Sequence, residues 1–264
     1  MSLTQGSGPL GRGDGNAANY TIQSPAHRIL FQPDPRRLRA FAGDRQVLDT
    51  TRAHLLHETG IRPVVYVPLE DIDPDLLERS DTTSFCPFKG DASYWSLRAG
   101  DGDVRADAVW AYEEPLPEAS WLRGFVALYF DRVDRWMVED ENVDGDRLRD
   151  PYHRIDVHVS SRPVTVTAAG AVIARSQRPT LLFETSMPLR AYIPRGDVTA
   201  GHLRASEKTT TDPYIGDAIW WHVHAGGELF EDAAHSYELP RAEAMKIAGL
   251  VCFGGECVAV ELGG

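Results

Sequence analysis

Cysteine is scarce in this 264-residue sequence, which contains only Cys86, Cys252 and Cys257. Three thiols are too few and too oddly numbered for a disulfide framework, and they cannot form the two close ligand pairs typical of structural zinc. His222 and His224 alternate onto one face of a predicted strand, but two ligands alone do not make a metal site. We therefore predict reduced thiols, no metal and a cytoplasmic location.

Long apolar runs and basic clusters are also missing. No run approaches the roughly 20 apolar residues that span a bilayer. Residues 1–26 are rich in Gly, Ser and polar residues, lack the apolar core of a secretory signal, and are predicted to form a disordered tail. The formal net charge is −12, and the basic residues are scattered rather than gathered on one face. We therefore expect neither a membrane nor a nucleic acid as partner.

The sequence does contain an internal repeat. Shifted by 126 residues, the chain matches itself without a gap at 21 of the 69 positions from His27 to Trp95. After one deletion the offset becomes 125, so that Tyr112 and Glu113 match Tyr237 and Glu238. The repeat predicts a first domain over 27–139 and a second over 153–264, joined by an acidic linker over 140–152.

Short β-rich runs separated by Gly-containing turns dominate both copies. Examples are 64–67, 94–98, 109–112 and 125–130. This spacing predicts a mainly β fold of antiparallel sheets, and no βαβ alternation is visible. Runs 117–122 and 241–247 begin beside a proline and are predicted to be short helices.

One segment carries a family resemblance. Residues 82–95 read TTSFCPFKGDASYW, with YVPLED upstream at 66–71 and AYEEP downstream at 111–115. These motifs resemble the bacterial and fungal family called domain of unknown function 427, which is also labelled nucleotidyltransferase-like. The resemblance covers both copies and implies two tandem β-tent-like domains, in which antiparallel sheets meet around a pocket.

Comparing the copies divides this motif into two groups of residues. Pro87, Gly90, Asp91 and Trp95 recur in copy two, whereas Cys86, Lys89, Tyr94 and Trp110 become Asp212, Ile215, Trp220 and His235. The recurring group suggests a scaffold, and the changing group suggests a site in copy one. The complete set of candidate ligand-binding residues is Tyr66, Thr83, Cys86, Lys89, Asp91, Tyr94, Trp110, Tyr112 and Glu113.

Each candidate also has a structural interpretation. Lys89 could activate the Cys86 thiol as a nucleophile, or Cys86 could simply fill space. Asp91 could contact a ligand or hold a turn through its carboxylate. The aromatic side chains could line a pocket or build the core, and Trp95 is expected in the core. Glu113 could be a solvated surface carboxylate.

Three functions remain open on the sequence alone. The first is binding of a small polar or aromatic ligand in copy one. The second is an enzyme using Cys86, Lys89 or Asp91, and the third is a protein-interaction scaffold. Metal-dependent nucleotidyl transfer needs several shared carboxylates and a phosphate-binding glycine loop. Asp71 and Asp73 offer one acidic pair, but copy two reads Asp197 and Thr199, so that label is weakly supported. The sequence identifies no cofactor.

Overall fold

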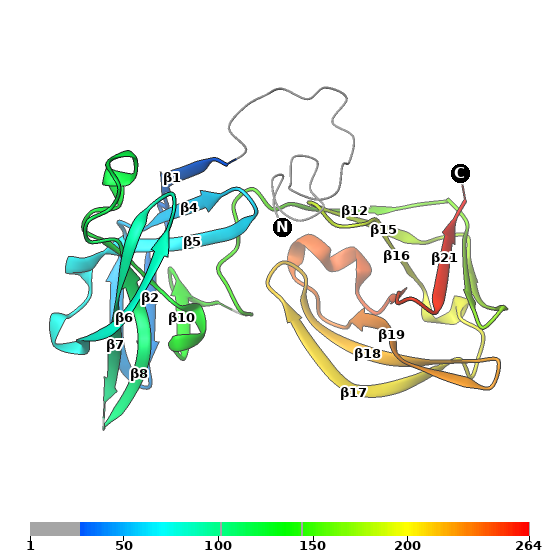
Figure 1. Ribbon diagram of the computed structural model, residues 1–264. Coiled ribbons are helices and arrows are strands. Elements are labelled where there is room, and N and C mark those ends of the chain that lie inside the picture. Colours follow the sequence, from blue (N-terminus) through cyan, green and yellow to red (C-terminus); the bar gives the residue numbers. More distant parts are fainter. Residues whose placement is uncertain (1–26, 101, 144, 264) are drawn as a thin grey trace. The chain divides into compact units, whose positions relative to one another are not determined.

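The computed structural model describes residues 27–100, 102–143 and 145–263, and these are mainly β. The predicted tail, 1–26, lies outside the described residues. The chain divides between Leu148 and Arg149 into two compact units. The first runs from blue to green and the second from green to red in Figure 1.

Two antiparallel sheets build the first unit. The larger has seven strands in the order β1-β4-β5-β9-β8-β7-β6, and the smaller has four in the order β11-β10-β2-β3. Their bounds are β1 (Ile29–Pro33), β2 (Leu38–Ala42), β3 (Arg45–Thr50), β4 (His54–Glu58), β5 (Ile61–Pro68), β6 (Leu77–Cys86), β7 (Gly90–Gly100), β8 (Asp103–Ala111), β9 (Phe125–Leu128), β10 (Arg135–Val138) and β11 (Glu141–Asn142).

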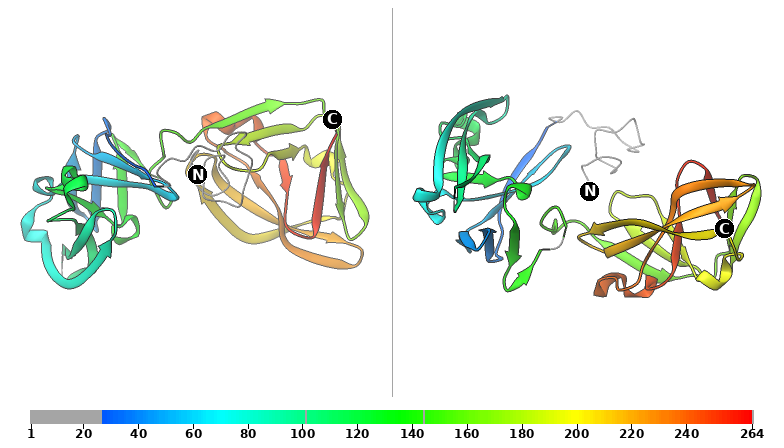
Figure 2. Two further views of the ribbon diagram at one scale, coloured as in Figure 1. Left: turned by 45° about the horizontal axis from the view of Figure 1, so that its top comes forward. Right: turned by 90° about the horizontal axis from the view of Figure 1, so that it is seen from below.

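The second unit repeats the strand order of the larger sheet, and its smaller sheet has three strands in place of four. Its larger sheet has the order β12-β15-β16-β20-β19-β18-β17, and its smaller sheet has the order β14-β13-β21. The bounds are β12 (Ile155–Val159), β13 (Val164–Ala168), β14 (Ala171–Ser176), β15 (Thr180–Glu184), β16 (Arg190–Ile193), β17 (Leu203–Asp212), β18 (Gly216–Ala225), β19 (Glu228–Tyr237), β20 (Val251–Phe253) and β21 (Val258–Leu262). Strands β17 to β19 run side by side as long arrows in Figure 2. The prediction of two tandem, mainly β domains is confirmed.

Short 3-10 turns complete both units. They are η1 (Leu69–Asp71), η2 (Pro74–Leu76), η3 (Pro117–Leu122), η4 (Phe130–Arg132), η5 (Arg195–Asp197) and η6 (Ala242–Ile247). The two predicted short helices are η3 and η6. Among the described residues, no helix has both the length and the apolar character needed to cross a membrane.

The larger sheet of the first unit has buried side chains on both faces. One face, with Val67 and Trp95, packs into the core shared with the smaller sheet. The other face packs with Leu122 of η3. Successive strand residues point to opposite faces, so alternation along β5, β7, β8 and β9 decides which core each side chain joins. The expectation that Trp95 lies in the core is confirmed.

The segment expected as an acidic linker divides between the two units. In the first unit β11 pairs with β10, and Leu148 packs against the core. In the second, Arg149 Nε donates to the Pro213 carbonyl at 2.7 Å, and the Asp150 amide donates to the Tyr214 hydroxyl at 2.7 Å. Residues 140–152 therefore contribute contacts to the units rather than only joining them.

Gly90 and its counterpart Gly216 are required by backbone geometry. Their φ angles are +103° and +115°, a region that L side chains rarely adopt. A Cβ on Gly90 would also lie 3.3 Å from the Leu116 amide nitrogen, where the backbone crosses closely. The recurrence of this glycine thus has a structural cause.

We predict that Gly90→Ala lowers the free energy of unfolding by about 2–3 kcal/mol, because backbone strain and a close contact add together. Gly100→Ala is the matched control, since Gly100 has φ +112° and open space around its Cβ position. It should lose only the strain component. Urea unfolding measures both variants, and equal losses would show that the Leu116 contact is unimportant.

Candidate functional site

Six of the nine candidate residues gather at one face of the larger sheet in the first unit. Five of them share one cluster, which is the core beneath η3, and these are Tyr66, Cys86, Tyr94, Trp110 and Tyr112. The sixth, Lys89, follows β6 and places its ammonium 5.8 Å from the centre of the Tyr112 ring. We call the five residues of the cluster, together with Tyr129, the aromatic face.

The rings of the aromatic face are joined by contacts and hydrogen bonds. The Trp110 and Tyr129 ring centroids lie 4.3 Å apart, and those of Trp110 and Tyr66 lie 6.3 Å apart at a steep angle. Ser84 Oγ and the Tyr94 hydroxyl are 2.8 Å apart. Burial raises the pKa of Tyr66, Tyr112 and Tyr129, so these hydroxyls stay protonated and can donate at neutral pH.

A buried ion pair lies beside the aromatic face. Lys89 Nζ contacts Glu58 Oε2, and their side chains are only 8% and 4% exposed. His27 Nε2 lies 2.7 Å from the other oxygen, Glu58 Oε1, and the His27 ring stacks on Phe88. Because an isolated buried charge is costly, the lysine and the carboxylate stabilise each other.

The remaining three candidates lie on the opposite side of the strands. Thr83 pairs with Ser93, and Asp91 pairs with Phe85. Because side chains alternate along β7, Asp91 and Ser93 share the face of Trp95 and not that of Tyr94. Glu113 forms an ion pair with Arg79, which lowers the pKa of the Glu113 carboxyl. Thr83, Asp91 and Glu113 are therefore separated from the aromatic face by the sheet.

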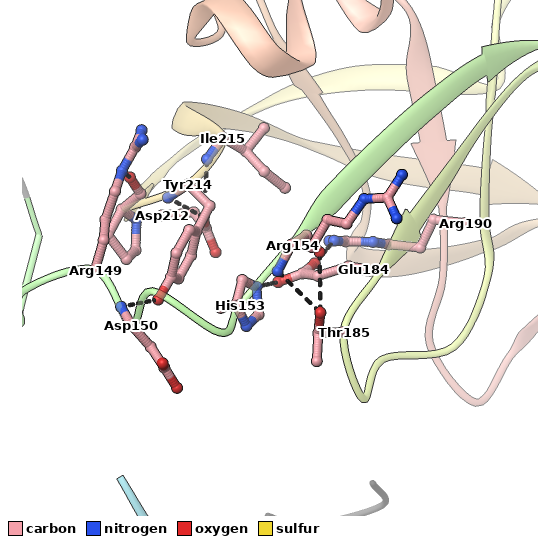
Figure 3. A network of polar contacts seen from close by, with 11 residues as sticks. Arg149, Asp150, His153, Arg154, Glu184, Thr185, Arg190, Asp212, Tyr214 and Ile215 are labelled. Carbon is pink, nitrogen blue, oxygen red and sulfur yellow. Dashed lines mark hydrogen bonds and ion pairs between the residues drawn. The ribbon is translucent and has the colours of Figure 1, made fainter. Parts of the chain in front are cut away.

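The second unit contains an equivalent buried ion pair, drawn in Figure 3. His153 Nε2 lies 2.8 Å from Glu184 Oε1, and the His153 ring stacks on Tyr214. Arg190 contacts the other carboxylate oxygen. Burial alone would raise the pKa of Glu184, but the hydrogen bond from His153 and the charge of Arg190 outweigh it, so the pKa is lowered.

The cation in this pair comes from a turn in the first unit and from a strand in the second. Lys89 becomes Ile215 in the second unit, and Arg190 stands where the first unit has Val64 on β5. The carboxylate and the histidine are retained, whereas the positive charge has moved. The loss of Lys89 in copy two is therefore a compensated exchange and does not by itself indicate loss of a site.

The same kind of exchange occurs on the other face. Arg79 on β6 pairs with Glu113, and its guanidinium lies 5.3 Å from the Trp95 ring. In the second unit Arg195, from η5, pairs with Glu238 and lies 4.6 Å from the Trp221 ring. This arginine, tryptophan and carboxylate group is kept although its arginine has moved.

Cys86 lies within the aromatic face. Its side chain packs in the same cluster as Tyr112, while Lys89 is held by Glu58. Its counterpart Asp212 accepts hydrogen bonds from the Tyr214 and Ile215 amides at 2.8 and 2.9 Å. The aspartate in copy two thus stabilises the turn before β18.

The acidic pair considered for metal binding has structural partners. Asp71 accepts from Thr50 Oγ1 at 2.6 Å and pairs with Arg52. Asp197 repeats this contact with Ser176 at 2.7 Å. The Asp73 carboxylate accepts a hydrogen bond from the Asp75 amide at the start of η2. No group of three or more His, Cys, Asp or Glu suited to a metal occurs among the described residues.

Sequence reasoning missed three residues at this site. His27 and Glu58 recur as His153 and Glu184, and this recurrence was the available signal. Tyr129 becomes Gly254 and lies in a loop after β9, so neither recurrence nor strand alternation identifies it.

The exchanged cation gives a direct test. Lys89→Ile should lower the free energy of unfolding by about 3–5 kcal/mol, because the buried Glu58 carboxylate loses its lysine and keeps only the contact with His27. Adding Val64→Arg reproduces the second unit and should recover most of this loss. Urea unfolding measures both, and Val64→Arg alone is the control. A double variant no more stable than Lys89→Ile would contradict the exchange.

A second test concerns His235, the counterpart of Trp110. Burial and the charge of Arg190 lower the pKa of His235 to about 4, and its Nε2 lies 3.2 Å from the Tyr192 hydroxyl. Between pH 6.5 and 4 the His235 side chain is protonated in the unfolded chain but not in the folded chain. The free energy of unfolding therefore decreases as the pH is lowered through this range. From pH 7.5 to 5.5, the wild type should lose about 1 kcal/mol more than His235→Gln.

The control for this comparison is His158→Gln, because the His158 side chain is 58% exposed. It should follow the wild-type pH dependence. Identical pH dependence in all three proteins would contradict a buried, neutral His235.

Comparison with known proteins agrees with the repeat. No curated protein matches the chain significantly. The model of one family, described as a domain of unknown function (DUF427), matches twice, at residues 30–139 and 156–263. These two matches cover most of the chain and coincide with the two units, so this protein belongs to the DUF427 family as a tandem pair of its domains.

Proposed function

We propose that the first unit binds a small ligand on its aromatic face. The observation that carries this proposal is the convergence of Tyr94, Trp110 and Tyr129 at one place on the sheet, where Tyr94 and Trp110 are partly buried and Tyr129 is exposed. Tyr129 is 39% exposed. Partly exposed rings with donor groups offer a stacking surface for a planar or cationic molecule.

Differences in the second unit support the assignment of ligand binding to the first unit. There the counterpart of Tyr129 is Gly254, and that of Trp110 is His235, which is directed at Tyr192. Fewer aromatic rings are therefore available on the second unit. Binding is proposed for the first unit alone.

Charge supports a small molecule over a nucleic acid as the partner. The net charge of −12 repels a polyphosphate chain. Lys89, which lies beside the Tyr112 ring, is held by Glu58. We propose a cytoplasmic location, because the low cysteine content suits a reducing compartment.

A metabolite library screened by differential scanning fluorimetry tests the proposal. Ligands at ten times their Kd should stabilise the wild type by about 1.4 kcal/mol. Tyr129→Ala should abolish these shifts, because it removes the exposed ring. Trp220→Ala, which removes a ring from the second unit, is the matched control and should keep them. The proposal fails if no compound stabilises the wild type, or if Tyr129→Ala responds as the wild type does.

A further inference from the structure

The second unit fills part of its own aromatic surface with a lysine. Lys208 Nζ lies 4.2 Å from the centre of the Trp220 ring and 3.4 Å from Asp232 Oδ2. An ammonium over an indole ring beside a carboxylate is the arrangement by which proteins bind amines. Lys208 thus behaves as an amine ligand supplied by the chain itself.

The first unit keeps the surroundings of this lysine but not the lysine. Tyr94 stands for Trp220, and Asp107 stands for Asp232. Asp107 and Asp232 have the same unusual backbone conformation, with φ angles of 50° and 49°. At the position of Lys208 the first unit has Thr82, which carries no charge.

The two rings also point the same way. The Tyr94 hydroxyl lies 2.8 Å from Ser84 Oγ, and Trp220 Nε1 donates to Thr210 Oγ1 at 2.9 Å. Ser84 and Thr210 are counterparts on β6 and β17. The ring surface that Lys208 covers in the second unit therefore corresponds to the Tyr94 surface in the first.

The Asp107 carboxylate is charged and held in place. Ser80 Oγ donates to its Oδ1 at 2.6 Å and Thr82 Oγ1 to its Oδ2 at 2.7 Å. These hydrogen bonds lower the pKa of Asp107. A carboxylate accepts more than two hydrogen bonds, so capacity remains for an ammonium.

We propose that the ligand of the aromatic face is an organic cation, a primary or quaternary amine, bound between Tyr94, Tyr129 and the Asp107 carboxylate. This inference rests on the proposed function and names the ligand class. Arg132 would repel a bound cation, because its positive charge acts to lower the pKa of both Asp107 and Tyr129. Arg132→Ser should therefore tighten amine binding.

The probes are choline, n-butylammonium and 3,3-dimethylbutan-1-ol, the uncharged isostere of choline. Each is titrated into the ¹⁵N-labelled full chain, and the indole N–H signals of Trp110 and Trp220 are followed, assigned with Trp110→Phe and Trp220→Phe. In the wild type the amines should shift the Trp110 signal, and the neutral alcohol should bind about tenfold more weakly.

Two exchanges between the units test the role of the lysine. Thr82→Lys installs the chain's own ammonium and should weaken amine binding to the first unit about tenfold. Lys208→Thr should uncover Trp220, so that the amines shift its indole signal. The controls are Val104→Lys, which adds a lysine at an exposed position of β8, and Lys246→Thr, which removes one from η6.

The outcomes separate this inference from the proposed function. Equal binding of choline and its isostere, or amine binding unchanged by Thr82→Lys and not created by Lys208→Thr, overturns the amine assignment. If library compounds still lose their effect in Tyr129→Ala, ligand binding stands and only the amine class is wrong. If neither the amines nor any library compound binds, both proposals fail.

Discussion

The carboxylate buried beside the aromatic face sets a requirement that both units meet. A buried carboxylate is tolerated only when a positive charge and hydrogen bonds compensate its lost hydration, so Glu58 and Glu184 each need a cation within reach. The histidine before the first strand supplies the hydrogen bond in both units. This pair ties the first strand, the next strand in the sheet and the turn before β7 together, and so supports the surface on which the aromatic rings lie.

Much of the fold follows from the sequence because repetition and alternation are both local and countable. The repeat gave two units of one topology, and alternation separated Tyr94 from Trp95. Alternation also places Thr83, Asp91 and Glu113 apart from the aromatic residues, because adjacent positions in a strand are close in sequence but face opposite ways. The sheet thus divides the motif between two faces.

The rest of the site depends on contacts between different segments, which a pattern within one strand does not contain. Lys89 meets Glu58 across 31 residues of sequence, and Arg190 reaches Glu184 from the neighbouring strand. When the two copies are compared position by position, Lys89 is lost in copy two, because Ile215 stands there. The structure shows that the charge was kept at a different position, so the meaningful unit of comparison is the contact and not the residue.

The two cation positions also differ in how they can be exchanged. Replacing a lysine in the turn after the sixth strand by an arginine on the strand equivalent to β5 takes one gain and one loss of charge. If the loss comes first, the carboxylate is left without its cation, at a cost of about 3–5 kcal/mol, which is a large part of the stability of a small domain. If the gain comes first, the carboxylate keeps a cation throughout, so the order of the two substitutions decides whether the domain stays folded between them.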